Sequence, residues 1–253
     1  MRVLFSVLAL LAASTFLFAT PTTIVVRAKA KDAKFIGSSV GGAHVVIRNK
    51  MTQVILAQGV TEGTTGNTDK IMQESRERYS QLADDNTAKF TAVLDLDEPT
   101  LLEISVTAPA NQRQAAVVSS TEVWGIPGKD ILGDGVVLEV PGFIIDVLSP
   151  RTHQFITLNE RAANTLTITA NVVMMCGCTI SNGGLWDANK MEVKAIIKLD
   201  GEAAGEVELG IDEPNLFKGE FLVPASGLYE IVVYAYDPVT GNTGVDKVNV
   251  VVN

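Results

Sequence analysis

The chain is short of the residues on which most enzyme catalysis and covalent cross-linking depend. Its 253 residues include only two histidines and two cysteines, which leaves little material for histidine-based catalysis or for a disulfide framework. Charged residues make up only 19% of the chain, and their formal net charge is -9. Because an acidic surface repels phosphate backbones, we expect no nucleic-acid partner.

Long apolar runs are also scarce, and the one that exists stands at the N-terminus. Arg2 precedes an apolar run over residues 3–18, and a small residue, Ala19, follows it. This order is typical of a secretory signal peptide, and the run is short for a membrane span, which needs about 20 residues. The sequence therefore predicts a signal peptide at 1–19, an exported protein that is periplasmic or extracellular, and a mature form without a stable membrane span. The alternative is an uncleaved N-terminal anchor.

What the chain does contain is apolar residues in alternation. It is 47% hydrophobic, with 21 glycines and nine prolines, which is enough apolar material for a core. Short alternating runs separated by turn residues are typical of β-sandwiches. We therefore expect an all-β fold. The expected strands cover residues 23–33, 43–49, 54–60, 90–96, 101–106, 165–178, 191–199, 205–209, 217–223, 228–236 and 245–252.

Pauses in this pattern predict two β-sandwich domains in tandem. The strand pattern stops around Pro150, which suggests a linker there. The first domain is expected over 20–149 and the second over 150–253. Residues 62–88 interrupt the first domain with a polar stretch, predicted to be a mobile surface insert. The alternative for this insert is a partner-binding loop, since rigid sandwiches often carry function on their loops.

Segments of both domains resemble known families. Residues 41–63 (GGAHVVIRNKMTQVILAQGVTEG) and 88–99 (AKFTAVLDLDEP) resemble the transthyretin-like or carboxypeptidase regulatory-like domain. Residues 217–244 (FKGEFLVPASGLYEIVVYAYDPVTGNTG) resemble a bacterial immunoglobulin-like module. In that stretch Tyr229 stands at the place of the tyrosine corner, in which a tyrosine hydroxyl ties a loop to the backbone. The resemblances imply fold and export, and they do not imply chemistry.

The sequence Met174-Met175-Cys176-Gly177-Cys178 is the most unusual constellation of the chain. Thiolates and thioethers are soft ligands that suit Cu(I), and paired thiolates also suit Zn²⁺. On a regular strand Cys176 and Cys178 would share the core side with Met174. They are then buried structural thiols, a disulfide allowed by a bend at Gly177, a redox pair, or a copper or zinc site made by Cys176, Cys178 and Met174.

Two further features of the sequence have structural explanations. Residues 37–41 fit the G-x-S-x-G pattern around Ser39, but a strand follows where a hydrolase needs a helix, and His153 falls in the other domain. We interpret this match as chance. Trp124 and Trp186 are expected to pack in the cores of the first and second domain.

The sequence thus favours an exported, non-catalytic binding or structural protein. It would present loops and sheet edges to a protein partner in an envelope or extracellular assembly, and no cofactor is expected. The segments expected to make contact are the insert at 62–88 and the loop at 178–187. The alternative function is a periplasmic copper- or zinc-binding protein that uses the Cys176–Cys178 pair.

Overall fold

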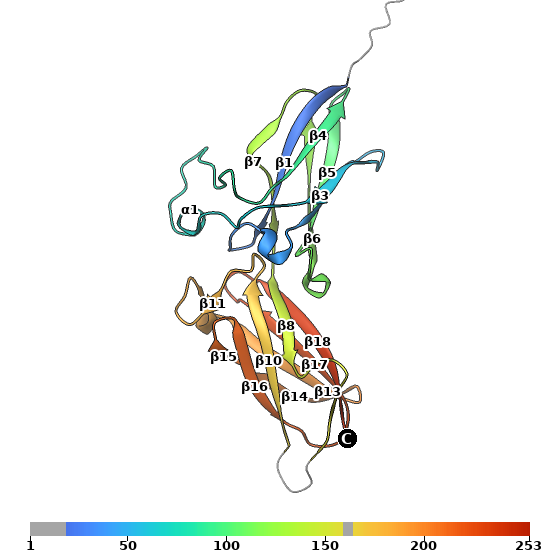
Figure 1. The fold of residues 1–253 in the computed structure, drawn as a ribbon, viewed down its shortest axis with the longest axis vertical. Helices are drawn as coiled ribbons and strands as arrows, with labels where there is room; N and C mark the ends of the chain where they lie inside the picture. Colours follow the sequence, from blue (N-terminus) through green and yellow to red (C-terminus); the bar gives the residue numbers. More distant parts are fainter. Residues whose placement is uncertain (1–18, 159–163) are drawn as a thin grey trace, which may run out of the picture.

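The computed structural model describes residues 19–158 and 164–253, and nearly all of its regular structure is β-strand. Two sandwiches lie end to end along the long axis of the molecule (Figure 1). The predicted all-β fold with tandem sandwiches is therefore confirmed. The predicted signal peptide lies almost entirely outside the described residues. Within those residues, we find no helix with the length and apolar character that a membrane crossing requires.

The strands of the first sandwich lie in two sheets, one three-stranded with the order β4-β1-β7 and one four-stranded with the order β3-β2-β5-β6. The first strand pairs antiparallel with the fourth and parallel with the seventh. The elements are β1 (Thr20–Ala30), η1 (Ser38–Val40), β2 (His44–Asn49), β3 (Ile55–Val60), α1 (Thr68–Met72), β4 (Phe90–Leu96), β5 (Thr100–Ala108), η2 (Arg113–Ala115), β6 (Val117–Gly125) and β7 (Ile131–Val140).

The second sandwich packs the sheet β15-β16-β10-β8 on the sheet β14-β13-β17-β18-β9. This is the strand order of an immunoglobulin-like sandwich, with β14 and β9 as added edge strands. The elements are β8 (Phe143–Ser149), β9 (Gln154–Ile156), β10 (Thr165–Met174), β11 (Ile180–Ser181), β12 (Trp186–Asp187), η3 (Ala188–Lys190), β13 (Glu192–Leu199), β14 (Glu202–Glu208), β15 (Gly210–Glu213), β16 (Leu216–Leu222), β17 (Gly227–Tyr236) and β18 (Thr243–Val252).

Alternation explains why these segments form sandwiches. Successive side chains of a strand point to opposite faces, so every second residue enters the core. In β10 the buried row is Leu166, Ile168, Ala170, Val172 and Met174. Buried residues of both sandwiches form one contiguous cluster, which runs through Val140 and Phe143 where the chain passes from one to the other.

The expected domain boundary at 149/150 needs correction. Strand β8 pairs antiparallel with β10, so it belongs to the second sandwich although it precedes Pro150. The chain leaves the first sandwich after Val140 and enters the second at Phe143. Pro150 therefore ends a strand and not a domain, because proline has no N–H to donate to a ladder.

The insert at 62–88 is held at its base. Isolated bridges join Glu62 to Lys89 and Thr64 to Thr87. The buried guanidinium of Arg27 donates from Nη1 to the carbonyl oxygens of Thr87 and Ala88. Burial lowers the pKa of Arg27, and the nearby carboxylates, of which that of Asp134 acts most strongly, oppose this shift. The mobility expected for the middle of the insert stays a prediction.

The tyrosine corner expected at Tyr229 is present. The side chain of Tyr229 is fully buried, and its hydroxyl donates to the carbonyl oxygen of Ala225 at 2.7 Å. This bond ties the turn before β17 to the strand itself. The same strand places Ile231, Val233 and Ala235 in the core, as the alternation predicted.

Replacing Tyr229 with phenylalanine keeps the ring and leaves the carbonyl of Ala225 without its donor. We expect the free energy of unfolding to fall by about 1 kcal/mol, measured by urea unfolding. Tyr236→Phe is the matched control, because Tyr236 is on the same strand with its side chain on the exposed face. Unchanged stability of the Tyr229 variant would contradict this role of the hydroxyl.

Candidate functional site

The junction between the sandwiches is built around a buried asparagine. Asn242 is fully buried in the turn before β18. Its Nδ2 donates to the carbonyl oxygen of Lys31 at 3.1 Å, and its Oδ1 accepts the N–H of Gly142 at 2.9 Å. The N–H of Lys31 donates in turn to the carbonyl oxygen of Val140 at 2.9 Å. One side chain thus connects the β1 turn of the first sandwich with the crossing segment and the second sandwich.

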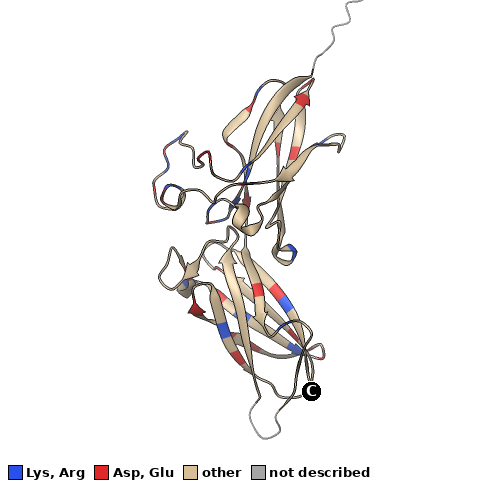
Figure 2. Ribbon diagram, in the orientation of Figure 1, with Lys and Arg blue, Asp and Glu red and all other residues tan. Residues whose placement is uncertain are grey.

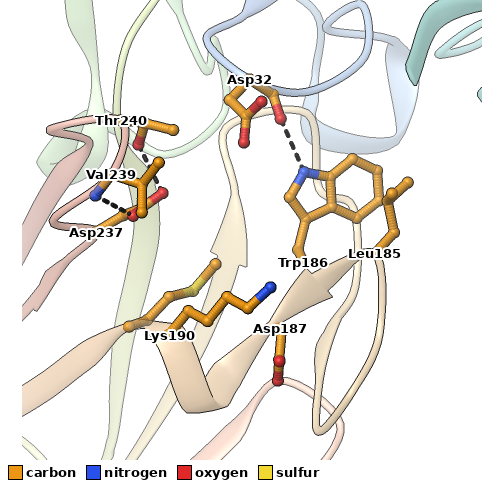
Figure 3. Close-up of a pocket in the computed structure, with 9 residues that line it drawn as sticks. Asp32, Leu185, Trp186, Asp187, Lys190, Asp237, Val239 and Thr240 are labelled. Atoms are coloured by element: carbon orange, nitrogen blue, oxygen red, sulfur yellow. Dashed lines mark hydrogen bonds between the residues drawn. The ribbon is translucent and has the colours of Figure 1, made fainter. Parts of the chain in front are cut away.

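Trp186 makes a second contact between the sandwiches. Its indole Nε1–H donates to the carbonyl oxygen of Asp32 at 2.9 Å, and its ring is buried, as expected for a core residue (Figure 3). Asp187, the next residue, caps η3 by accepting the N–H of Asn189, and it also accepts the N–H of Gly183. These bonds to backbone N–H groups, with that of Gly183 the strongest, lower the pKa of Asp187. The cap holds the loop so that Trp186 faces the first sandwich.

A third contact lies at η2 of the first sandwich. The side-chain amides of Gln112 and Gln114 donate to the two carboxylate oxygens of Asp146, at 2.8 and 2.9 Å. Asp146 is on β8, which places the acceptor on the second sandwich. A carboxylate that accepts one bond at each oxygen fixes the direction between the two elements that it joins.

The two cysteines are joined to each other and also lie at this junction. Cys176 and Cys178 form a disulfide, and Gly177 between them has a positive φ of 75°. A Cβ on Gly177 would stand 2.7 Å from a methyl group of Val40, so the cysteine turn sits directly on η1 of the first sandwich. Of the alternatives that the sequence leaves open for this pair, the structure contains the disulfide with its bend at Gly177.

The disulfide also restricts the hypothesis of a copper or zinc site. In the disulfide neither Cys176 nor Cys178 offers a thiolate, and Met174 is fully buried. Across residues 19–158 and 164–253, no group of three or more His, Cys, Asp or Glu side chains is placed to hold a metal ion. A copper or zinc site at Cys176, Cys178 and Met174 thus requires the reduced chain.

A cavity of about 220 Å³ opens between the sandwiches beside Trp186. Figure 3 shows Asp237, Val239 and Thr240 on the wall opposite Trp186. The carboxylate of Asp237 accepts the N–H of Val239 and the hydroxyl of Thr240, so its own turn occupies both oxygens. Burial raises the pKa of Asp32, and the charge of Asp237 raises it further. The lining thus holds three aspartates and Lys190, with no histidine or serine among its residues.

The residues of the hydrolase-like pattern do not converge. Ser39 lies in η1 at the junction. The N–H of His153 donates to the carbonyl oxygen of Asn249, toward the end of β18 that lies away from the junction. The interpretation of the pattern as chance fits this separation.

The expectation for Trp124 is wrong. Trp124 is 59% exposed on β6, an edge strand, and does not cap the first core. Its strand pairs with β5 so that Trp124 stands opposite Leu101, on the face turned away from the core. The alternation of apolar residues does not reveal the exposure of Trp124, because the outward positions of β6 are themselves partly apolar.

Sequence reasoning also missed the residues that join the domains. Asn242 belongs to the Asp-Pro-Val-Thr-Gly-Asn turn, which lies within the stretch that resembles a bacterial immunoglobulin-like module. Its partner Lys31 is 211 residues away in the chain. The turn motif was the available signal, and nothing in it points to Lys31.

Comparison with known proteins gives no relative and only distant structural likeness. No family model matches the chain, and no curated protein matches it. The solved structures include an engineered protein, at 13% identity and a TM-score of 0.33, over 48% of this chain and 22% of that one. They also include the fibronectin(III)-like modules of Clostridium thermocellum CbhA, at 14% identity and a TM-score of 0.28, over 92% and 94%.

A third likeness is to the titin domains Z1Z2 in complex with telethonin, at 12% identity and a TM-score of 0.25, over 93% of this chain and 89% of that one. This chain spans less than a quarter of the engineered protein. None of the three likenesses carries a functional argument. The description of the second domain as immunoglobulin-like follows from its own sheet order.

Asn242→Ala removes the side chain that connects the two sandwiches and leaves the N–H of Gly142 and the carbonyl of Lys31 unpaired. We expect the free energy of unfolding to fall by about 1–3 kcal/mol, measured in urea. Hydrogen exchange at Gly142 should also become faster. Asn182→Ala, in an exposed loop, is the matched control and should change neither quantity. If both variants behave like the wild type, Asn242 does not hold the junction.

Proposed function

We propose that the chain is an exported, non-catalytic binding or structural protein. Its two sandwiches act as one stiff arm that presents loops and sheet edges to a protein partner in an envelope or extracellular assembly. The observation that carries this proposal is the junction, where Asn242, Trp186 and Asp146 each join one sandwich to the other. A junction that is hydrogen-bonded at several points suits an arm that holds a surface in place.

The insert at 62–88 is the loop best placed for contact. Tyr79 in its middle is 85% exposed, and the guanidinium of Arg78 lies 4.7 Å from the centre of its ring. Tyrosine and arginine are enriched among the residues that dominate binding energy at protein interfaces. Arg27 anchors the base of the insert from the core, so the exposed middle projects from a fixed point.

Residues 178–187 serve both the junction and the exposed surface. Trp186 is buried at the junction, while Leu185 beside it is exposed. The expected contact surface in this loop therefore shrinks to residues around Leu185. The rest of the loop supports the arm.

Three finer statements belong to the same proposal. The first domain is of the transthyretin-like or carboxypeptidase regulatory-like kind, on the sequence resemblance of residues 41–63 and 88–99. The protein is periplasmic or extracellular, on the leader at 1–19, and the disulfide fits an oxidising compartment. Copper or zinc binding is a second function only for a chain in which Cys176 and Cys178 are reduced.

A photo-crosslinking amino acid in place of Tyr79 tests the proposal in the cells that make the protein. We expect a covalent adduct of one discrete mass in the exported fraction, because this side chain is free to meet a partner. The same substitution at Leu222, exposed on β16, is the matched control and should give none. An intracellular protein that retains residues 1–19, or equal labelling at both positions, would refute the proposal.

A further inference from the structure

Strand β3 is an open edge of the first sandwich. It is the outermost strand of its sheet and pairs only with β2. The N–H of Thr61 donates to the carbonyl oxygen of Ala43 at 2.9 Å, which sets the phase of the ladder. Because hydrogen-bonded pairs alternate in an antiparallel ladder, Gln58 and Val60 point their N–H and C=O groups away from β2. These backbone groups face outward, and at Gln58 another strand can pair with them, whereas just beyond Val60 the same edge is already bridged from Glu62 to Lys89.

The side chains along this edge are apolar and accessible. Val54, Ile55, Leu56 and Val60 are each at least 37% exposed. No residue from Val54 to Val60 carries a charge, so the ribbon of β3 is drawn without blue or red (Figure 2). An uncharged, apolar edge is a template for pairing with another strand.

Acidic residues lie on most of the other edge strands of the described residues. Natural proteins use charges on edge strands to prevent pairing between chains. Among the described edge strands of four or more residues, all except β3 carry at least one carboxylate: Asp95 on β4, Glu122 on β6, Asp134 and Glu139 on β7, Asp146 on β8, Glu202, Glu206 and Glu208 on β14, and Asp212 and Glu213 on β15. β3 is thus the exception among these longer edge strands, and the other uncharged edge, β9, is only three residues long.

We propose that β3 pairs antiparallel with β3 of a second copy of this chain, which joins the two four-stranded sheets into one. A chain with a formal net charge of -9 repels its own copy over most of its surface. Pairing through β3 brings no like charges into register. In a two-fold arrangement the exposed apolar side chains of one copy cover those of the other.

Gln58 suits such a two-fold pair. Its amide both donates and accepts hydrogen bonds, so two copies of the same side chain complement each other across the axis. Self-pairing of β14 would instead bring together strands that each carry three glutamates. The charge pattern therefore favours a second copy at β3 over a second copy at β14.

This inference deepens the proposed function, and it rests on that function for its biological use. It names the partner of one sheet edge as the protein itself. The insert around Tyr79 remains available for a different partner. Self-pairing and contact through the insert can therefore fail separately.

Sedimentation equilibrium of the mature full-length chain tests the pairing. We expect a dimer whose fraction rises with protein concentration and also with NaCl, because salt screens the repulsion between acidic copies. Gln58→Lys should raise the dissociation constant at least tenfold, since it places two cations together at the pair. Ala203→Lys, exposed on the β14 edge, is the matched control and should dimerise like the wild type.

A cysteine variant gives a second readout that does not depend on the lysine variant folding. Cys176 and Cys178 are bonded to each other, so Gln58→Cys supplies the free thiol. Paired antiparallel residues lie about 5.5 Å apart, within reach of a disulfide. Mild oxidation should give a covalent dimer of Gln58→Cys and none of Thr121→Cys, which is exposed on the β6 edge.

Three results would overturn the inference: a wild-type chain that stays monomeric at every concentration and salt, a dimer that Gln58→Lys leaves intact, or equal cross-linking of the two cysteine variants. A monomer that still gives a discrete adduct from Tyr79 would overturn the pairing and leave the proposed function standing. A dimer that gives no such adduct would leave the pairing standing and overturn the proposed function.

Discussion

The side-chain amide of Asn242 is hydrogen-bonded to groups on both sides of the junction between the two sandwiches. Its donor and acceptor are both used, on Lys31 and Gly142, in a place from which water is excluded. A buried amide that lost either partner would cost free energy comparable to its desolvation. The relative position of the sandwiches is therefore coupled to the satisfaction of this polar group, and the bonds of Trp186 and Asp146 act at the same junction.

The disulfide supports the same junction. A bond between residues only two apart closes a very short loop, so in the chain-entropy model it stabilises the whole fold less than a bond across a long loop would. Its effect is local, on the turn at Gly177 that lies against Val40. Cys176 and Cys178, which the sequence offered as a metal site, thus have a structural role where the two sandwiches touch.

Features that depend on residues close together in the sequence could be predicted, and features that depend on residues far apart in the sequence could not. The buried row of β10 and the corner at Tyr229 follow from residues within one strand or turn, and both were predicted. Strand β6 was missed because Val117, Val118 and Trp124 are apolar at exposed positions and obscure the alternation. The bond from Asn242 to Lys31 spans 211 residues, and no local pattern marks such a pair.

We propose that the two sandwiches form one stiff arm. Residual dipolar couplings of backbone N–H bonds in a weakly aligned sample measure this stiffness, because each sandwich reports its own orientation. We expect one alignment tensor to fit the couplings of both sandwiches together. Two tensors of clearly different magnitude would show that the sandwiches move independently, and they would contradict the account.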